Sequence, residues 1–187
     1  MKEVFHRRFS TELGELELFA SRDALTGLYF ADETPTEQPG AAESDPAGIL
    51  DAAEQEIQEY LAGTRKAFDL PLDFSWGTAF QQSVWRGLQN IGYGQTVSYG
   101  ELARRIERPR AARAVGGANH VNPLSIIIPC HRVIAANGSL GGYGGGLWRK
   151  QALLDLEQGQ PLSRPAIKNS LKSDYQRATA IGSSPSI

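Results

Sequence analysis

Residues 98–118 read SYGELARRIERPRAARAVGGA, and this stretch decides what fold the second half of the chain can adopt. Ser98 stands three residues before Glu101, the spacing of a capping box, so a helix should begin there. Pro109 breaks that helix and suits the start of a second one, expected at residues 110 to about 118. Two short helices in a basic region predict a helix-turn-helix, although an ordinary helical hairpin has the same spacing.

The second of these helices has an unusual set of side chains. Four alanines and two glycines leave its surface nearly smooth, and Arg113 is its one long side chain. Small residues permit tight packing against a neighbouring helix, which is one interpretation. The other is a helix that approaches a nucleic-acid backbone closely, with Arg113 reaching in. In that case the residues that would line the contact are Ala111, Ala112, Ala114 and Gly116.

The N-terminal part predicts a small antiparallel sheet with one helix. Strand character occurs at residues 4–9, 15–20 and 25–30, and the second run alternates apolar and polar positions as a sheet with one wet face does. Residues 32–48 are rich in Pro, Glu, Thr, Ala and Gly and predict an exposed loop. A helix over residues 49–61 should follow, with Gly63 as its stop.

The C-terminal part predicts mostly helix. Besides the helix pair, we expect a helix over residues 79–90 and a last one over 148–157. Residues 124–129 predict a short buried strand that delivers Cys130 at its end. Residues 138–146 hold six glycines and are expected to form a loop in which Tyr143 can touch a ligand. The fold class is therefore α+β, with a sheet-and-helix part before a mostly helical part.

The formal net charge of −2 conceals a sharp division along the chain. Residues 1–75 carry 6 basic and 16 acidic side chains, whereas residues 76–150 carry 9 and 2. The break favours two domains, at 1–75 and 76–158. Basic residues clustered in this way can neutralise phosphates. The remainder, 159–187, is poor in apolar periodicity and is expected to be a flexible tail.

A single cysteine excludes an internal disulfide and any site built from several thiolates. The longest aliphatic run is three residues, at 126–128, far short of the roughly 20 that a membrane helix needs. The N-terminus leads into no apolar signal core. We therefore expect a cytoplasmic protein with no membrane partner.

Cys130 has a sequence context that favours a nucleophile over a buried structural thiol. It lies between Pro129 and the basic pair His131-Arg132, surroundings that are expected to lower the thiol pKa. His131 is the obvious base, although neighbours in an extended chain point to opposite faces, so a water or a turn is needed between them. Because Glu101 is better used as a cap, Glu157 is the preferred partner to orient His131.

The run Pro129-Cys130-His131-Arg132-Val133 resembles the active-site signature of the O6-alkylguanine-DNA alkyltransferases, also called methylated-DNA-protein-cysteine methyltransferases. The resemblance is strong over about residues 78–158 and general in the N-terminal part. Further motifs similar to the family's, at matching spacing, are Phe80-Gln81-Gln82, Ser98-Tyr99, Ala111 to Ala118, Asn122-Pro123, Gly142-Tyr143 and Leu153-Leu154 followed by Glu157.

The resemblance implies an irreversible, single-turnover transfer of the alkyl group from O6 of guanine to Cys130. It further implies that His131 acts through a water as the base and that Glu157 orients His131. Asn122 corresponds to the family's hinge residue. Tyr99 corresponds to the tyrosine that hydrogen-bonds the flipped base.

The resemblance also assigns roles around the base. Arg113 would replace the extruded nucleotide in the helix, in a monomer bound to the minor groove of double-stranded DNA that contains alkylated guanine. The carbonyls of Cys130 and Val133 would accept from the exocyclic amine, and the Tyr143 loop would close over the base. No cofactor is implied, because the thiolate itself displaces the guanine.

The chain departs from the family's pattern at two places. Gly144 stands where some members carry a polar side chain, so a backbone N–H replaces a hydroxyl near O6. Some members hold zinc in the N-terminal domain, but here that region has His6 and no cysteine, so we expect no metal.

Two other functions fit parts of the pattern. A thiol hydrolase could use Cys130, His131 and Glu157, but it has no use for a smooth basic helix with one arginine. A module that binds alkylated bases without repairing them would not need the thiol. A thiol hydrolase would turn over many equivalents of substrate, whereas an alkyltransferase would stop after one. A Cys130→Ala variant distinguishes the binding module, because only repair depends on the thiol.

Overall fold

The computed structural model describes residues 3–32, 45 and 47–162, so most of the expected tail and of the loop at 32–48 lies outside the described residues. A three-stranded antiparallel sheet opens the chain, in the order β1 (Phe5–Thr11), β2 (Gly14–Ala20) and β3 (Leu25–Phe30). The predicted antiparallel sheet is confirmed. Gly14 makes the first turn with φ of 106°, a conformation that favours glycine.

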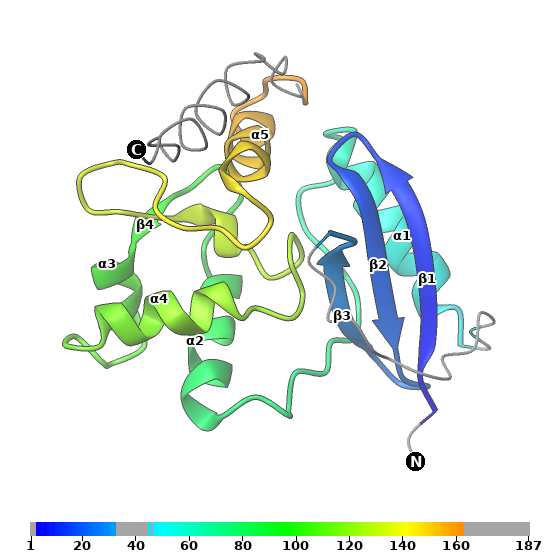
Figure 1. The fold of residues 1–187 in the computed structure, drawn as a ribbon, viewed down its shortest axis with the longest axis horizontal. Coiled ribbons are helices and arrows are strands. Elements are labelled where there is room, and N and C mark those ends of the chain that lie inside the picture. Colours follow the sequence, from blue (N-terminus) through cyan, green and yellow to red (C-terminus); the bar gives the residue numbers. More distant parts are fainter. Residues whose placement is uncertain (1–2, 33–44, 46, 163–187) are drawn as a thin grey trace, which may run out of the picture.

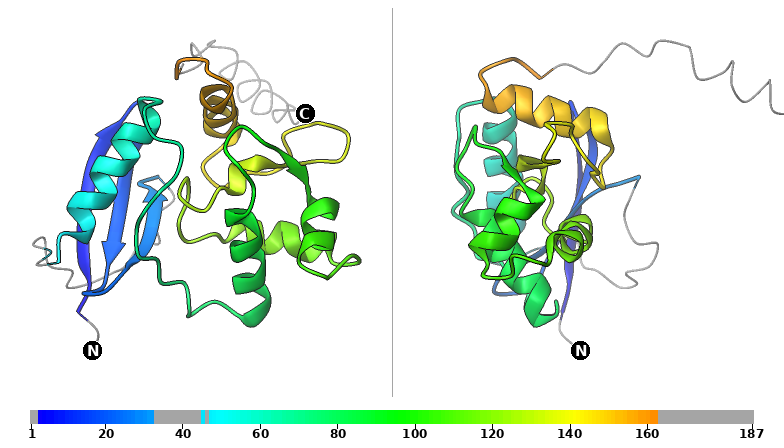
Figure 2. Two further views of the ribbon diagram at one scale, coloured as in Figure 1. Left: turned by 180° about the vertical axis from the view of Figure 1, so that it is seen from behind. Right: turned by 90° about the vertical axis from the view of Figure 1, so that its left-hand side faces the viewer.

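The expected wet face of β2 is wrong: Glu17 and Phe19 are buried like Leu16 and Leu18, because Glu17 accepts from Arg8 and Phe19 stacks on His6. Leu16 lies opposite Phe9 on one side and Phe30 on the other, and Leu18 lies opposite Leu28. Helix α1 (Ile49–Leu61) covers one face of the sheet, where Leu50 and its neighbours on the apolar stripe are fully buried (Figure 2). The predicted helix and the observed one have the same ends.

The second part of the chain is mostly helical, as predicted. Its helices are α2 (Ala79–Gln89), α3 (Tyr99–Arg105), α4 (Ala112–His120) and α5 (Leu147–Glu157). Two short strands, β4 (Val97–Ser98) and β5 (Val133–Ile134), pair in parallel. The fully buried Trp85 of α2 donates from its indole to the Ala118 carbonyl at 2.9 Å, which fixes α2 against α4.

The α3–α4 pair differs from the expectation in its details. Ser98 accepts from the backbone N–H of Glu101 at 3.1 Å, but the Glu101 carboxylate pairs with Arg104 and Arg105 instead of closing a capping box. The second helix begins at Ala112, two residues later than predicted, because the Ala111 N–H turns back to the Arg108 carbonyl.

The two parts meet along β3 and share one core (Figure 1). Leu28 donates from its backbone to the Pro123 carbonyl at 2.8 Å, and the Ser125 N–H donates to the Leu28 carbonyl at 3.1 Å. The edge strand of the N-terminal sheet is therefore tied directly to the segment that leads to Cys130. In the part of the chain that the structure describes, no helix is long and apolar enough to cross a membrane.

The prediction of a strand at residues 124–129 is wrong. Only Leu124 makes a bridge, to Leu28, and the following residues form turns, with Ile126 at φ of 71°. The segment is buried on several sides, so its sequence has the same continuous apolar run as a buried strand. Cys130 lies in a 3-10 turn, η1 (Cys130–Arg132), rather than at the end of a strand.

Candidate active site

The site is built where α4, the turns before Cys130, η1 and α5 converge. Cys130 is 4% exposed and faces a cavity of about 420 Å³. The cavity is lined by Tyr29, Asn119, His120, Val121, Asn122, Ser125, Cys130, Tyr143 and Gly144. Tyr29 belongs to β3, so the N-terminal part supplies one wall of the cavity that holds the thiol.

Two asparagines tie the C-terminal end of α4 to the thiol. The Asn122 amide donates to the Ile128 carbonyl at 2.8 Å and to Cys130 Sγ at 3.1 Å, while its oxygen accepts from the Leu124 N–H at 3.1 Å. Asn119 donates to the Cys130 carbonyl at 3.4 Å. Asn122 thus both closes the turn and contacts the sulfur, consistent with the hinge role that its motif implied.

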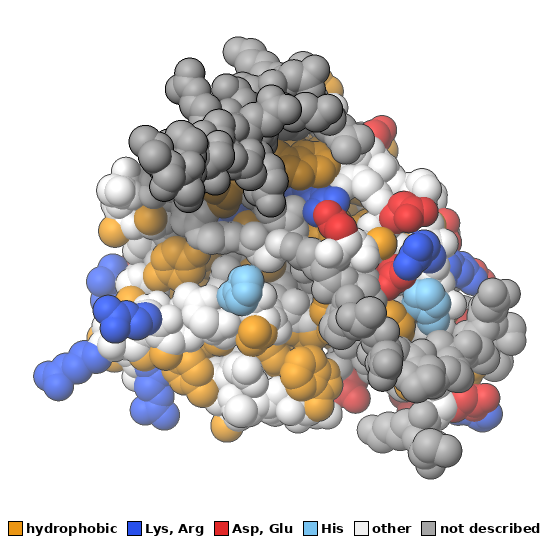
Figure 3. All heavy atoms as spheres, viewed as in Figure 1, with side chains coloured by type: hydrophobic (Ala, Val, Ile, Leu, Met, Phe, Trp, Pro, Cys, Tyr) orange, Lys and Arg blue, Asp and Glu red, His pale blue; other side chains and the backbone are white. Residues whose placement is uncertain are grey.

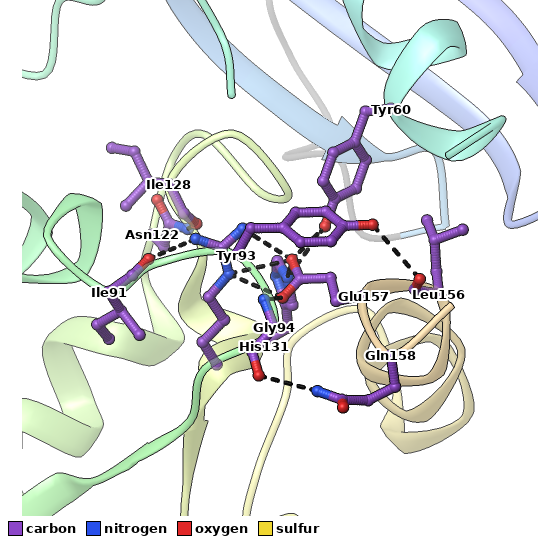
Figure 4. Close-up of polar contacts among 11 residues, drawn as sticks. Tyr60, Ile91, Tyr93, Gly94, Asn122, Ile128, His131, Leu156, Glu157 and Gln158 are labelled. Carbon is purple, nitrogen blue, oxygen red and sulfur yellow. Dashed lines mark hydrogen bonds and ion pairs between the residues drawn. The ribbon is translucent and has the colours of Figure 1, made fainter. Parts of the chain in front are cut away.

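His131 and Glu157 lie together in a buried polar network (Figure 4). His131 is fully buried, and its Nε2 lies 2.9 Å from Glu157 Oε1. A carboxylate only accepts, so Nε2 carries the proton of this pair. The other ring nitrogen, Nδ1, is buried and has no hydrogen-bond partner among the described residues, which leaves its lone pair free to accept.

Glu157 is held by several donors at once. The Arg132 guanidinium donates to both of its oxygens, with Nε at 3.0 Å from each. Tyr60 of α1 donates to Oε1 at 2.5 Å, and the Gly94 N–H donates to Oε2 at 2.9 Å. Burial alone would raise the pKa of Glu157, but the hydrogen bonds from His131, Arg132 and Tyr60 outweigh it and lower the pKa to about 2. The carboxylate is therefore charged throughout the working pH range.

The predicted lowering of the thiol pKa is wrong for this structure. Burial raises the pKa of Cys130 to about 11, despite the hydrogen bond from Asn122 and the charge of Lys150. Arg132 is directed to Glu157 instead of the sulfur. Burial also lowers the pKa of His131, so this residue is neutral and able to take a proton. At rest, Cys130 is therefore a thiol and His131 a neutral imidazole.

The glycine loop is fastened by a buried lysine. Lys150 donates from Nζ to the Val133 carbonyl at 2.6 Å and to the Gly142 carbonyl at 3.1 Å. The Tyr99 hydroxyl hydrogen-bonds to the backbone of Gly142, and burial raises its pKa. Of the two carbonyls expected to accept from the base, that of Val133 already has Lys150 as a partner and that of Cys130 has Asn119. The Cys130 carbonyl also accepts from the Val133 N–H, so both of its lone pairs are already in use.

The expected DNA-contacting helix is exposed on the side away from the core. Val115 and Ala118 of α4 are buried, whereas Arg113 and Ala114 are exposed. Ala111, Ala112 and Gly116 are half-buried. Lys and Arg side chains gather over this end of the molecule in Figure 3. The exposed arginines here, which we call the arginine patch, are Arg104, Arg105, Arg108, Arg110 and Arg113.

Sequence reasoning missed four residues that the fold brings to this site. Tyr29 and Asn119 line the cavity, while Tyr60 and Lys150 fix its supporting groups. No spacing links residues 29 and 60 to residue 130, so no local signal could have found them. Among the described residues, no group of three or more His, Cys, Asp or Glu side chains is placed to hold a metal ion.

Comparison with known families decides the classification. Residues 79–159 match the 6-O-methylguanine DNA methyltransferase DNA-binding domain, and residues 4–74 match the ribonuclease-like domain of the same proteins. The chain belongs to the 6-O-methylguanine DNA methyltransferase family.

Similar members of this family are curated as methylated-DNA–protein-cysteine methyltransferases. The protein from Methanosarcina acetivorans is 53% identical, over 82% of this chain and 98% of its own. The one from Mycolicibacterium paratuberculosis is 47% identical, over 83% and 93%. Among solved structures, Mycobacterium tuberculosis OGT in complex with DNA is 44% identical, with a TM-score of 0.77 over 84% of this chain and 95% of that one.

Proposed function

We infer that this protein is a DNA repair protein that transfers the alkyl group from O6 of guanine in duplex DNA irreversibly to its own Cys130, once per molecule. One observation carries the inference. The chain's single thiol opens into a cavity of about 420 Å³, and the residue that follows it, His131, is buried and paired with Glu157. Family membership supplies the reaction class, and the OGT relative is known in complex with DNA.

The chemistry follows from the protonation states at rest. His131 is neutral with a free Nδ1 lone pair, so it can take the Cys130 proton through a bridging water while Glu157 stabilises the imidazolium. The thiolate then attacks the alkyl carbon, the carbon–O6 bond breaks, and its electron pair stays on the guanine. Tyr99 donates a hydrogen bond toward the leaving base, which finally takes up a proton. The thioether product cannot be hydrolysed by these groups.

The high pKa of the Cys130 thiol allows its reactivity to be controlled by binding of the base. A thiol with pKa about 11 is almost fully protonated at neutral pH, so it resists adventitious alkylation. We propose that a base seated against Val133, Tyr143 and Gly144 brings the alkyl carbon to the sulfur and makes deprotonation productive. Activation is thereby tied to occupancy of the pocket.

DNA engagement is assigned to the exposed side of α4. An alkylated base must leave the stack to reach a buried thiol, and its damaged pair costs less to open. The small residues Ala111, Ala112, Ala114 and Gly116 permit a close minor-groove approach, and Arg113 fills the gap. We propose that a monomer binds in this way, with residues 76–158 as the DNA-binding, catalytic domain and residues 1–75 as its support.

Intact-protein mass measurement after incubation with duplex DNA containing O6-methylguanine tests the function. We expect the gain of one methyl on the peptide that contains Cys130, reaching a limit of one per protein. Cys130→Ala should abolish the gain yet keep lesion binding. A thiol hydrolase would instead turn over many equivalents of an ester, and an unmodified wild-type protein would sink the proposal.

A further inference from the structure

The end of α1 brings a tyrosine of the N-terminal part into the catalytic network. Tyr60 is fully buried, its hydroxyl donates to Glu157 Oε1 at 2.5 Å, and it lies 3.3 Å from His131 Nε2 (Figure 4). We propose that Tyr60 is a positioning residue for alkyl transfer, which fixes Glu157 and limits how strongly this carboxylate draws a proton onto His131. The inference rests on the proposed function and gives the N-terminal part a role in the chemistry.

The ring of Tyr60 is held so that its hydroxyl has little choice of direction. It packs against Phe68 with ring centroids 5.1 Å apart and meets the Tyr93 ring edge-on at 6.0 Å. The hydroxyl has one proton, and the nearest acceptor is the charged Oε1 of Glu157. Burial, and next the neighbouring carboxylate, raise the pKa of Tyr60 far above its usual value. The hydroxyl therefore remains a donor at every working pH.

Sharing of the Glu157 charge is the physical step that links Tyr60 to His131. Oε1 accepts from Tyr60, His131 and Arg132 together, so each donor receives only part of the negative charge. Without the Tyr60 hydroxyl, Oε1 would interact more strongly with the His131 ring. That change favours the imidazolium over the neutral ring.

The other groups around His131 all act against protonation. Arg132 is its neighbour in η1 and Lys150 reaches it from α5, and both cations disfavour a second positive charge. Burial acts in the same direction and is the largest influence. Glu157 is the group that opposes them. Any residue that weakens the interaction of Glu157 with His131 therefore makes His131 less basic.

A base that is already protonated cannot accept the thiol proton. The rate of alkyl transfer should consequently fall on the acid side as His131 becomes charged. Because Tyr60 holds that transition at low pH, its loss should move the acid limb of the rate profile toward neutrality. A residue that served only to fill space would not move this limb.

The test uses the full chain with Tyr60→Phe, which keeps the ring and removes the hydroxyl. We expect the second-order rate constant of methyl transfer at neutral pH to fall roughly 3- to 10-fold, the range for loss of one buried hydrogen bond. The acid limb of the profile should shift upward. The matched control is Tyr93→Phe, whose hydroxyl donates to the Leu156 carbonyl and not to Glu157, and it should leave the limb in place.

A direct measurement follows the His131 ring by NMR titration in the absence of DNA. The chain has three histidines, so His6 and His120 serve as internal references. Tyr60→Phe should raise the His131 pKa. Incorporation of 3-fluorotyrosine at position 60 makes the hydroxyl a stronger donor, and it should move the His131 pKa in the opposite direction.

A double-mutant cycle with Glu157→Gln shows whether Tyr60 acts through the carboxylate. In that background the effect of Tyr60→Phe on the rate should disappear. The proposal is overturned if the His131 titration and the acid limb are unchanged in both position-60 variants. A loss of stability with a parallel loss of rate but no shift also overturns it. Failure of methyl transfer in the wild type would sink the proposed function, whereas the NMR titration tests Tyr60 without any transfer.

Discussion

At the scale of single residues, one group of the site carries the proton and another is free to remove it. Cys130 rests as a thiol because burial outweighs the hydrogen bond from Asn122. His131 rests as a neutral base because burial outweighs the pull of Glu157. Neither group is activated in the free protein by its own pKa. In the free protein Cys130 is therefore a thiol and His131 a neutral ring, and under our proposal proton transfer becomes productive when a base occupies the cavity.

Asn122→Ala should weaken transfer by making the thiolate harder to form. The amide donates to Sγ at 3.1 Å, so its removal raises the thiol pKa further and also frees the turn at Ile128. We expect at least a tenfold slower reaction with a small thiol reagent at neutral pH, the factor for a shift of about one pKa unit. Asn137→Ala, an exposed asparagine that bonds Ser139, is the control. An unchanged thiol pKa in Asn122→Ala would contradict this role.

Arg113→Ala should weaken repair in duplex DNA more than reaction with the free base. Arg113 is exposed on α4 and its proposed task is to fill the gap left by the extruded nucleotide. The rate constants with a methylated duplex and with free O6-methylguanine measure the two effects. Arg86→Ala removes an exposed arginine on α2, outside the arginine patch, and should change neither. Equal losses on both substrates would argue against the assignment of Arg113.

At the scale of elements, the glycine loop connects the two parts of the chain. Phe30 of β3 is fully buried between this loop and α5, with the Arg149 guanidinium 4.2 Å from its ring centroid. Arg149 also donates to the Leu13 carbonyl at 2.8 Å. Lys150 fastens the loop from its other side through the Gly142 carbonyl. Two neighbouring residues of α5 thus anchor the loop, Arg149 at the Gly145 carbonyl and Lys150 at the Gly142 carbonyl.

Gly145→Ala should destabilise the protein because there is no room for a methyl group. A Cβ at this position would lie 2.4 Å from Phe30 Cε2, so the core ring must move. We expect a loss of about 1–3 kcal/mol in the free energy of unfolding, measured by denaturant titration. Gly142→Ala lies in the same loop with nothing within 4 Å of its Cβ, and it should be nearly neutral. Equal stability of the two variants would show that Phe30 adapts without cost.

At the scale of the whole molecule, buried charges join parts that are far apart in sequence. Tyr60 and Glu157 are 97 positions apart, yet the Tyr60 hydroxyl donates a buried hydrogen bond to Glu157. The acidic surplus lies on the first 75 residues and the basic surplus on the next 75. The positive charge thus lies on the part of the chain to which we assign DNA binding. We propose that the negative charge of the first 75 residues keeps that part away from the phosphates.

Acid should unfold this protein in part through Glu157. Its pKa is about 2 in the folded chain against an ordinary 4.5, so the unfolded chain binds the proton first as pH falls. The stabilisation is complete above pH 4.5 and is lost as pH falls toward 2, up to about 3 kcal/mol. Glu157→Gln should lower stability at neutral pH and flatten the dependence in this window. Glu12→Gln, an exposed carboxylate, should leave the dependence as it is.

Sequence by itself determined the elements and the reacting set. Local periodicity placed the three strands and α1, because the burial of one face leaves a period that can be read without partners. Motif spacing singled out Cys130, His131 and Glu157, and the structure brings them to one place. Periodicity failed at residues 124–129, where burial on several sides produces the same apolar run in turns as in a strand.

Only the tertiary structure decided the surroundings of that set. Arg132 follows Cys130 by two residues, yet the fold directs it to Glu157, and burial raises the thiol pKa that the sequence predicted to fall. Tyr29 and Tyr60 reach the site from strands and helices at the other end of the chain. The sequence shows which charged residues are close to Cys130 along the chain, but not which group each of them contacts. Desolvation and the direction of each hydrogen bond exist only once the chain is packed, and these two effects set the chemistry of the site.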